Sequence, residues 1–222
     1  LANNSLISDP SDNFNFIDPE VQQTLTTIDI SNNSFTGSLS DKIFGLNNLV
    51  SLILSTNCFQ GSIPDLICNI TTFETLILSG LSSAPSCRDY FWDNTELVDV
   101  FDGFEPMKNM MGSLPSCVLQ KNPNMRIYYA SGNGFTGQLS DLPDKLLKLD
   151  LSHNYLTGSL PPSIGQKTKL NFLSLSNNRI GGDLKAFNEY NGSSAFELHL
   201  DINRLSGSIP APLSKLETLD IL

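Results

Sequence analysis

Asp150, Ser152 and His153 lie within four residues of one another and carry the three side-chain types of a hydrolytic triad. A serine nucleophile also needs a strained turn that exposes its hydroxyl group, and backbone donors for the oxyanion. The sequence around Ser152 has no such signature. Ser152 instead belongs to a series of serines at the same place in a repeated phrase: Ser31, Ser55, Ser79, Ser131 and Ser176. A phosphate-binding G-x-x-x-x-G-K-S/T motif is also absent from the sequence, so we predict a protein that is not an enzyme and binds no cofactor.

The cysteines Cys58, Cys68, Cys87 and Cys117 form no C-x-x-C pair and have no histidine at metal-ligand spacing, which argues against a zinc site. Their even number favours disulfides formed in an oxidising compartment. A Cys87–Cys117 bond would close a loop of 30 residues. Cys68–Cys87 and Cys68–Cys117 are alternatives, and Cys58 could be a buried free thiol. The sequence does not choose among these pairings.

The stretch between residues 82 and 111 is rich in acidic and aromatic side chains. Its carboxylates do not follow the D-x-D-x-D-G spacing of a calcium-binding loop, so we predict no metal site. Its aromatic residues favour a loop that packs rather than one that extends into solvent. They include Tyr90, Trp92, Phe101 and Phe104.

The overall charge indicates which partners are excluded, and the sequons indicate the cellular location of the chain. The formal net charge is −10 and the basic residues are scattered singly, which argues against nucleic acid as a partner. No apolar run in the sequence approaches the ~20 residues that span a bilayer. N-x-S/T sequons predict N-glycosylation at Asn3, Asn32, Asn69 and Asn191. Together with the cysteines, they predict a secreted or cell-surface location.

One repeated phrase, L-x-L-S-x-N-x-L-x-G-x-L/I-P, must position all of these residues. It is complete at Leu149–Pro161, where leucines alternate with polar residues and predict a short strand with one buried face. Asn154 follows that strand, where a buried amide can bond backbone groups of neighbouring coils. Gly158 permits a turn, and Pro161 suits a segment outside the strand ladder. One phrase cannot bury its own apolar side, so the phrases must stack on one another.

The asparagine of the phrase recurs at 21- to 29-residue intervals, apart from one interval of 76 residues between Asn57 and Asn133. A fourth phrase starts within that interval at Phe73–Ser79 and has Leu81 in the asparagine place. About 28 residues then remain, which predicts an insertion at about 82–111 in a single solenoid over residues 1–222. The sequence begins and ends inside a phrase, so we interpret it as a piece of a longer protein. The recurring asparagines are Asn4, Asn33, Asn57, Asn133, Asn154, Asn178 and Asn203.

These phrases resemble the leucine-rich repeat superfamily, specifically its plant-type extracellular subclass with the consensus L-x-x-L-x-L-S-x-N-x-L-x-G-x-I-P. The resemblance implies an α/β solenoid: a right-handed, curved coil with a parallel sheet on its concave face and an inserted island loop. It further implies an ectodomain of a receptor-like protein, a secreted inhibitor or an adhesion protein. The cysteine-paired caps usual in this subclass are not present in the sequence.

The variable positions of the strands are predicted to line the concave face. In the coils before the insertion they are mostly small or β-branched, whereas later coils carry aromatic and charged residues, the types that supply binding energy at recognition surfaces. We predict that these residues, with the island aromatics beside them, bind a protein, peptide or glycan. They are Arg126, Tyr129, Lys148, Asp150, His153, Phe172, Glu197 and His199.

Two further expectations complete this prediction. Glycans on Asn3 and Asn32 would crowd the first coils and direct a partner to the later ones. The alternative function is a structural or adhesive scaffold of an extracellular matrix, wall or filament, in which the chain associates with itself or with neighbouring subunits.

Overall fold

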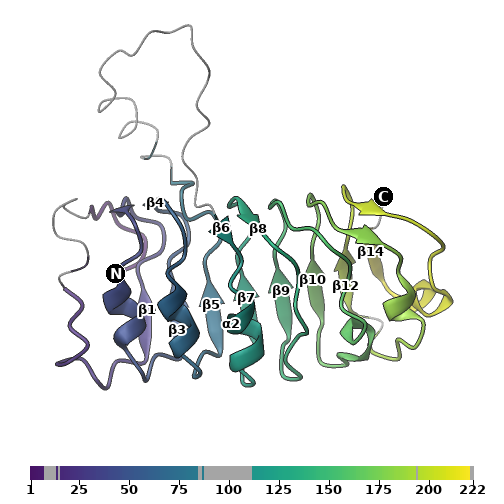
Figure 1. The fold of residues 1–222 in the computed structure, drawn as a ribbon, viewed down its shortest axis with the longest axis horizontal. Helices are drawn as coiled ribbons and strands as arrows, with labels where there is room; N and C mark the ends of the chain where they lie inside the picture. Colours follow the sequence, from purple (N-terminus) through teal and green to yellow (C-terminus); the bar gives the residue numbers. More distant parts are fainter. Residues whose placement is uncertain (8–13, 15, 85–86, 88–111, 194, 221–222) are drawn as a thin grey trace, which may run out of the picture.

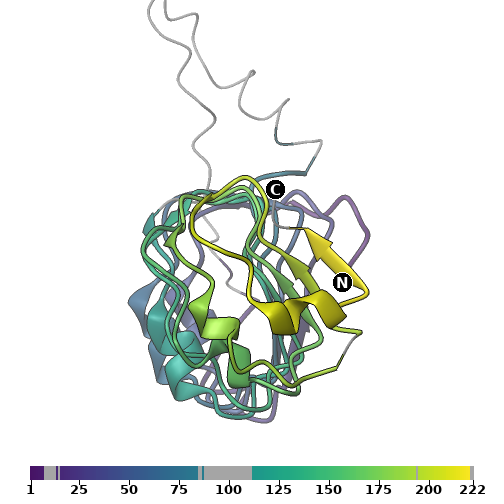
Figure 2. The same ribbon diagram turned by 90° about the vertical axis from the view of Figure 1, so that its right-hand side faces the viewer.

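One parallel sheet dominates the computed structural model, which describes residues 1–7, 14, 16–84, 87, 112–193 and 195–220 (Figure 1). Eight strands of three residues pair in the order β1-β3-β5-β7-β9-β10-β12-β14, one from each successive coil. Viewed along the stack, the coils superpose on one another (Figure 2). The predicted solenoid with its parallel sheet is therefore confirmed. The strands are β1 (Thr27–Asp29), β3 (Ser51–Ile53), β5 (Thr75–Ile77), β7 (Ile127–Tyr129), β9 (Lys148–Asp150), β10 (Phe172–Ser174), β12 (Glu197–His199) and β14 (Thr218–Asp220).

Short elements continue each coil beyond its strand. Three parallel two-residue pairs form where the phrase has its glycine: β2 (Thr36–Gly37) with β4 (Cys58–Phe59), β6 (Gly112–Ser113) with β8 (Phe135–Thr136), and β11 (Gly181–Gly182) with β13 (Arg204–Leu205). Helical turns then carry the chain back toward the next strand. These are η1 (Asp41–Gly45), η2 (Asp65–Asn69), α2 (Ser116–Lys121), η3 (Ile164–Gln166), η4 (Lys185–Phe187) and η5 (Ala211–Lys215).

A continuous apolar core runs through the stack. The middle residue of each strand from β1 to β12 is buried, because side chains alternate along a strand and the middle one faces inward. At the end near β2 and β4, Phe35 and Phe59 stack with their ring centroids 6.4 Å apart, and Phe14 lies 5.7 Å from Phe59. No coil could bury this surface alone.

A ladder of buried asparagine amides joins each coil to the coil before it. Asn154 donates from Nδ2 to the carbonyl groups of Ala130 (2.9 Å) and Leu151 (3.0 Å), and its Oδ1 accepts from the N–H group of Phe135 (3.1 Å). The Leu151 carbonyl also accepts from Asn178 of the following coil (2.9 Å). The same pattern recurs at the other buried ladder asparagines, Asn33, Asn57, Asn133 and Asn178.

The fourth coil keeps the ladder without an asparagine. The backbone carbonyl of Leu81 accepts from the N–H group of Phe59 (2.8 Å), which is the bond that an asparagine Oδ1 would make at this place. The N–H group of Leu81 donates to Oδ1 of Asn133 (3.0 Å), so the next coil is joined as well. At Leu81 the chain therefore turns inward, and its backbone carbonyl makes the hydrogen bond that an asparagine side chain accepts in the other coils.

Another buried asparagine, Asn122, does not belong to the repeated phrase and was not identified from the sequence. Asn122 follows α2, donates to the carbonyl groups of Val118 (3.0 Å) and Ile70 (3.2 Å), and accepts from the N–H group of Phe73 (2.9 Å). It joins the coil after the insertion to the coil before it, on the side where the helical turns lie.

Two disulfides pair Cys58 with Cys87 and Cys68 with Cys117. The suggestion that Cys58 is a free thiol was wrong, and so were the Cys87–Cys117 and Cys68–Cys87 pairings; of the alternatives raised, Cys68–Cys117 is confirmed. The backbone explains this outcome. The N–H group of Ala84 donates to the carbonyl of Asn57 (3.1 Å), so the chain leading to Cys87 lies against Cys58. Cys117 lies on α2, which packs against η2 and its Cys68.

The described residues at both borders of the predicted insertion belong to this framework. Its first residues, Ser82–Ala84, pack beside β4, and Gly112 pairs with Phe135 where β6 begins. The island residues Tyr90, Trp92, Phe101 and Phe104 lie outside the described residues, so their predicted role stays a prediction.

We predict that Asn154→Ala lowers the free energy of unfolding by about 3 kcal/mol, because the buried N–H group of Phe135 loses its acceptor. Urea unfolding followed by circular dichroism measures this change. The matched control is Asn47→Ala, whose side chain is exposed and should change stability by less than about 0.5 kcal/mol. Equal effects of the two substitutions would contradict the ladder as a source of stability.

A buried tyrosine, Tyr128, gives a second prediction. It stands where other strands have leucine or isoleucine, and its hydroxyl group has no hydrogen-bond partner among the described residues. Burial raises the pKa of Tyr128 well above its ordinary value of 10.0. Above that ordinary value the unfolded chain ionises while the folded chain does not, so stability is lost as pH rises past it.

Tyr128→Phe should therefore remain at least as stable as the native chain at pH 7 and lose less stability between pH 9 and pH 11. The physical reasons are that the substitution removes an unsatisfied buried group, worth about 1 kcal/mol, and one ionisable phenol. Melting temperatures measured across this pH range provide the test. Parallel curves for the two chains, or a clear loss of stability at pH 7, would contradict the prediction.

The disulfide pairing gives a third prediction. Proteolysis of the unreduced chain followed by mass spectrometry should yield peptides linked Cys58–Cys87 and Cys68–Cys117. Each bond closes a long loop, with sequence separations of 29 and 49 residues, so replacing either pair by serine should cost about 4 kcal/mol of stability. A linked Cys87–Cys117 peptide would contradict this arrangement.

Candidate binding surface

The in-register sheet places the predicted site residues in two parallel rows on its outer face. One row runs through the first strand positions, Ile127, Lys148, Phe172 and Glu197; the other runs through the third positions, Tyr129, Asp150, Ser174 and His199. Every one of these pairs is directly opposed on neighbouring strands. Of the eight predicted concave-face residues, only Arg126 and His153 lie outside β7, β9, β10 and β12. Arg126 directly precedes β7, and His153 follows the end of β9 by three residues.

An aromatic cluster, defined as Tyr129, Phe172 and His199, extends across these strands. The Tyr129 and Phe172 rings are 6.4 Å apart at 64°, an edge-to-face arrangement, and Phe172 lies 5.7 Å from the His199 ring. All three side chains are half-buried. Burial raises the pKa of the Tyr129 phenol, and the negative charges of Asp150 and Glu197 raise it further. Tyr129 therefore presents a neutral phenol ring to solvent.

Asp150 has a local structural role. Its Oδ1 accepts from the N–H group (3.0 Å) and from the hydroxyl group (2.7 Å) of Ser152, and Asp29 binds Ser31 in the same way. The Ser152 hydroxyl thus points to the carboxylate rather than to His153. The three residues considered above as a triad are not arranged as one.

His153 lies at the rim of the face, where the chain leaves each strand. It has a φ of 54°, as do its counterparts Thr56 (54°), Asn177 (55°) and Ile202 (52°) to within a few degrees. Its Nδ1 lies 2.8 Å from Nδ2 of Asn177 in the next coil. Ile202 is 65% exposed, and a β-branched residue in this left-handed conformation is unusual.

At the opposite ends of the strands, basic side chains surround a shallow hollow of about 220 Å³. Arg126, Lys145 and Lys169 are exposed there, and Lys145 Nζ donates to Oδ1 of Asn124 (2.7 Å). We call Arg126, Lys145, Lys148 and Lys169 the basic edge. Arg126 and Lys148 were predicted from the sequence, whereas Lys145 and Lys169 were not. Their signal was a lysine three residues before the first strand position of two successive coils.

The coils before the insertion present a different surface. Their outward strand positions are mainly neutral: Thr27, Ser51, Ile53, Thr75 and Ile77, with Asp29 as the exception. The predicted glycosylation sites Asn3 and Asn32 are exposed on the rim of the first coils, and Nδ2 of Asn32 donates to Oδ1 of Asn3 (2.9 Å). Asn69 and Asn191 are also exposed.

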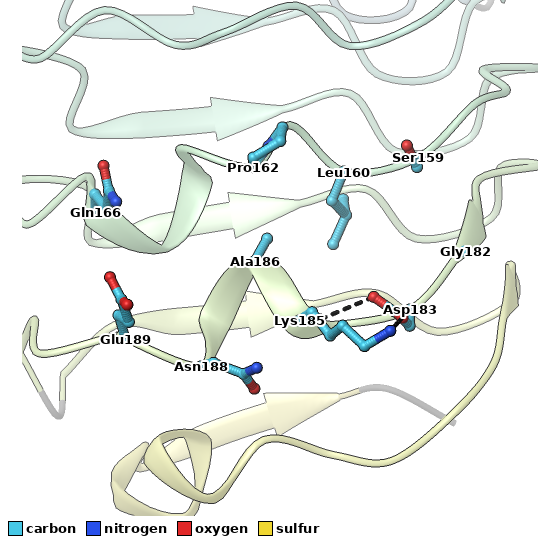
Figure 3. A pocket seen from close by; sticks show the side chains of 10 residues that line it. All are labelled: Ser159, Leu160, Pro162, Gln166, Gly182, Asp183, Lys185, Ala186, Asn188 and Glu189. Atoms are coloured by element: carbon cyan, nitrogen blue, oxygen red, sulfur yellow. Dashed lines mark hydrogen bonds and ion pairs between the residues drawn. The ribbon is translucent and has the colours of Figure 1, made fainter.

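Two larger hollows lie among the helical turns. One of about 520 Å³ lies beside η3 and η4, where Asp183 and Lys185 form an ion pair at 2.5 Å (Figure 3). Another of about 520 Å³ lies between α2 and residues 141–145 of the next coil. Since such hollows recur where successive coils have short or no helices, we attribute them to stacking. Figure 3 labels the side chains around the first: Ser159, Leu160, Pro162, Gln166, Gly182, Asp183, Lys185, Ala186, Asn188 and Glu189.

Within the described residues, no helix has the length and apolar composition to cross a membrane.

Comparison with protein families matches the Leucine Rich Repeat model at residues 24–46, 48–70 and 145–166. Receptor-like protein 32 of Arabidopsis thaliana is 32% identical over 149 residues, which are 56% of this chain and 17% of that protein. The Arabidopsis thaliana LRR receptor-like serine/threonine-protein kinase GSO2 is 41% identical over 75 residues, 34% of this chain and 6% of the kinase. The chain thus spans less than a fifth of the curated relatives that it matches.

Solved structures give the same result. The plant peptide hormone receptor RGFR1, in complex with RGF2, is similar with a TM-score of 0.65 and 26% identity, over 89% of this chain and 27% of that chain. The ectodomain of the Arabidopsis receptor kinase HAESA, in complex with an extended IDA peptide hormone, has a TM-score of 0.66 and 25% identity, over 89% of this chain and 30% of that chain.

Proposed function

We propose that this chain, a leucine-rich-repeat protein similar to plant receptor ectodomains, is a non-catalytic extracellular recognition module. Its partner is a peptide, or a peptide segment of a protein, that lies on the outer face of β7, β9, β10 and β12. The single observation that carries this proposal is the half-exposed aromatic cluster of Tyr129, Phe172 and His199.

Three rings on an open sheet, with Phe172 in contact with both Tyr129 and His199, need an explanation, because the leucines of the phrase already fill the core. A bound partner would cover the exposed part of each ring. Removing apolar surface from water contributes about 25 cal/mol per Å² and is the usual source of affinity. Aromatic side chains also dominate binding energy elsewhere because they bring large area at small conformational cost. The cluster is therefore placed as a recognition surface would require.

The contrast between the two halves of the sheet supports the same face. Before the insertion the outward positions are small or β-branched and mainly neutral, whereas Lys148, Asp150 and Glu197 surround the cluster after it. Glycans on the exposed Asn3 and Asn32 would further restrict a partner to the later coils. RGFR1 and HAESA, whose ectodomains are similar, are each described in complex with a peptide hormone.

The predicted island is included in the proposed binding surface only because the residues that border it lie near the aromatic cluster. Residues 82–84 and 112–113 bracket it next to β4 and β8, one coil before the aromatic cluster begins at β7. A partner on the later coils would lie beside it. The scaffold function has no specific support from the described residues.

We predict that replacing Tyr129, Phe172 and His199 together by alanine reduces partner affinity by about tenfold or more, because the three rings supply the apolar contact area. A display library of random twelve-residue peptides, selected on the native chain, provides the probes. Affinities of the selected peptides are then measured by biolayer interferometry on native and variant chains.

The matched control replaces Gln166, Asn188 and Glu189 by alanine, on the side with the helical turns. This control should bind the selected peptides like the native chain. Unchanged binding by the aromatic variant, with melting temperatures of all three chains equal, would sink the proposal. Light scattering that shows a stable oligomer closed over the sheet face would favour the scaffold instead.

A further inference from the structure

Basic residues gather in one part of a chain that is acidic overall. The chain has 13 Lys and Arg against 23 Asp and Glu, yet Arg126, Lys145, Lys148, Lys167 and Lys169 are five of those 13 and fall within 44 residues. Stacking concentrates them further, because residues one coil apart in the sequence become neighbours. Lys167 is engaged with Asp144 at 2.7 Å. The other four form the basic edge.

Backbone pairing fixes the layout of the basic edge. The N–H group of Leu147 donates to the carbonyl of Arg126 (2.9 Å), and that of Asn171 donates to the carbonyl of Leu147 (2.8 Å), so these three residues are neighbours across coils. Two residues earlier, Asn124, Lys145 and Lys169 form the adjacent row. Arg126, Lys145 and Lys169 therefore line one hollow of about 220 Å³, and Lys148 lies beside it at the start of β9.

The basic edge makes no direct ion pair among the described residues, although Lys169 lies near enough to Asp144 to lower the pKa of that carboxyl. Among the residues that the structure describes, no carboxylate lies within ion-pair distance of Arg126, Lys148 or Lys169, and Lys145 binds the neutral amide of Asn124. Glu74 is the one acidic residue among those lining the hollow. Like charges held close together are unfavourable, and an added anion relieves that repulsion.

The other end of the same strands is acidic. Asp150 and Asp201 lie there, each accepting from a serine hydroxyl. Glu197 is an exception, because it lies at the start of β12 in the same row as Lys148. From β7 to β10 the sheet face thus runs from positive at the start of the strands, through the aromatic cluster, to negative where the strands end. A ligand that crosses this face from the start to the end of the strands must therefore carry negative charge at one end and positive charge at the other.

We propose that the basic edge holds the carboxylate of an acidic residue of an extended peptide, whose apolar side chain lies on the aromatic cluster. This inference rests on the proposed function and adds the chemistry of the ligand. Lys169 precedes Phe172 by three residues, so at most about 10 Å of chain separates them. An extended peptide spans that distance with at most about three residues, so the acidic and apolar residues should be no more than about three positions apart.

A peptide fits this surface better than an acidic polysaccharide does. A polyuronate carries a negative charge on every sugar and would meet Asp150, Asp201 and Glu197 as well as the lysines. The basic groups are also confined to three coils, which matches one or two carboxylates rather than a long polyanion. Only a chain of mixed side chains can place each charge opposite its complement.

The test changes the sign of the basic edge. Arg126→Glu, Lys145→Glu and Lys169→Glu are combined; all three side chains are exposed, so the fold should persist, as melting temperature would verify. The random peptide library is selected again on this variant. We expect peptides from the native chain to contain Asp or Glu no more than about three residues from an aromatic or aliphatic residue, and to bind the variant at least tenfold more weakly.

Peptides selected on the variant should keep the apolar residue and carry Lys or Arg in the acidic place. Binding to the native chain should weaken as salt rises, because exposed charges are screened. The matched control, Lys42→Glu with Lys121→Glu and Lys215→Glu, makes the same change of net charge on the helical turns. It should select the same peptides as the native chain.

Each other outcome is decisive. Peptides that need the aromatic cluster but show no acidic preference would overturn this inference and leave the proposed function standing. If the control variant bound the native-selected peptides as weakly as the basic-edge variant does, the effect would come from net charge alone, and the inference would also be overturned. An oligogalacturonate that displaces the peptides and loses binding on the variant would replace the peptide by a polysaccharide. A library that yields no binder on the native chain would count against both proposals.

Discussion

The buried asparagine ladder is the interaction on which the rest of this structure depends. Each amide lies in the core, where an unpaired polar group would cost about 1–3 kcal/mol, and each finds partners only when the neighbouring coil is stacked in one register. Asn154 therefore does more than stabilise its own turn. By binding Ala130 and Phe135 of one coil and sharing the Leu151 carbonyl with Asn178 of the next, it fixes how three coils align. A slip of one residue would leave those groups unpaired.

The same constraint explains how the stack accommodates an insertion. Leu81 lacks an amide, so its backbone carbonyl turns inward to the N–H group of Phe59. That turn carries the chain across Cys58, where the disulfide to Cys87 holds it, while Cys68–Cys117 and Asn122 join the coils on the other side. Register is thus restored by β7, and the surface beyond the insertion is as regular as the surface before it.

Regular stacking also turns sequence variation into a surface pattern. Since every strand pairs in register, a side chain changed in one coil meets the same position of its neighbours, about 4.8 Å away. Tyr129, Phe172 and His199 become one aromatic cluster in this way, and lysines more than twenty residues apart become one basic edge. The architecture is repetitive, and the recognition chemistry lies in what does not repeat.

The sequence by itself determined the solenoid, the strand positions, the ladder and the rows of the outer face, because these follow from a local periodicity that every coil repeats. It placed Leu81 in the ladder and predicted the insertion by counting residues. The tertiary structure decided what depends on contacts between coils: that Cys58 meets Cys87, that Asp150 binds Ser152, and that Lys145 and Lys169 join Arg126 around one hollow. Such contacts bring together residues whose spacing in the chain follows no repeat, since insertions and turns set that spacing and only folding brings the side chains within reach.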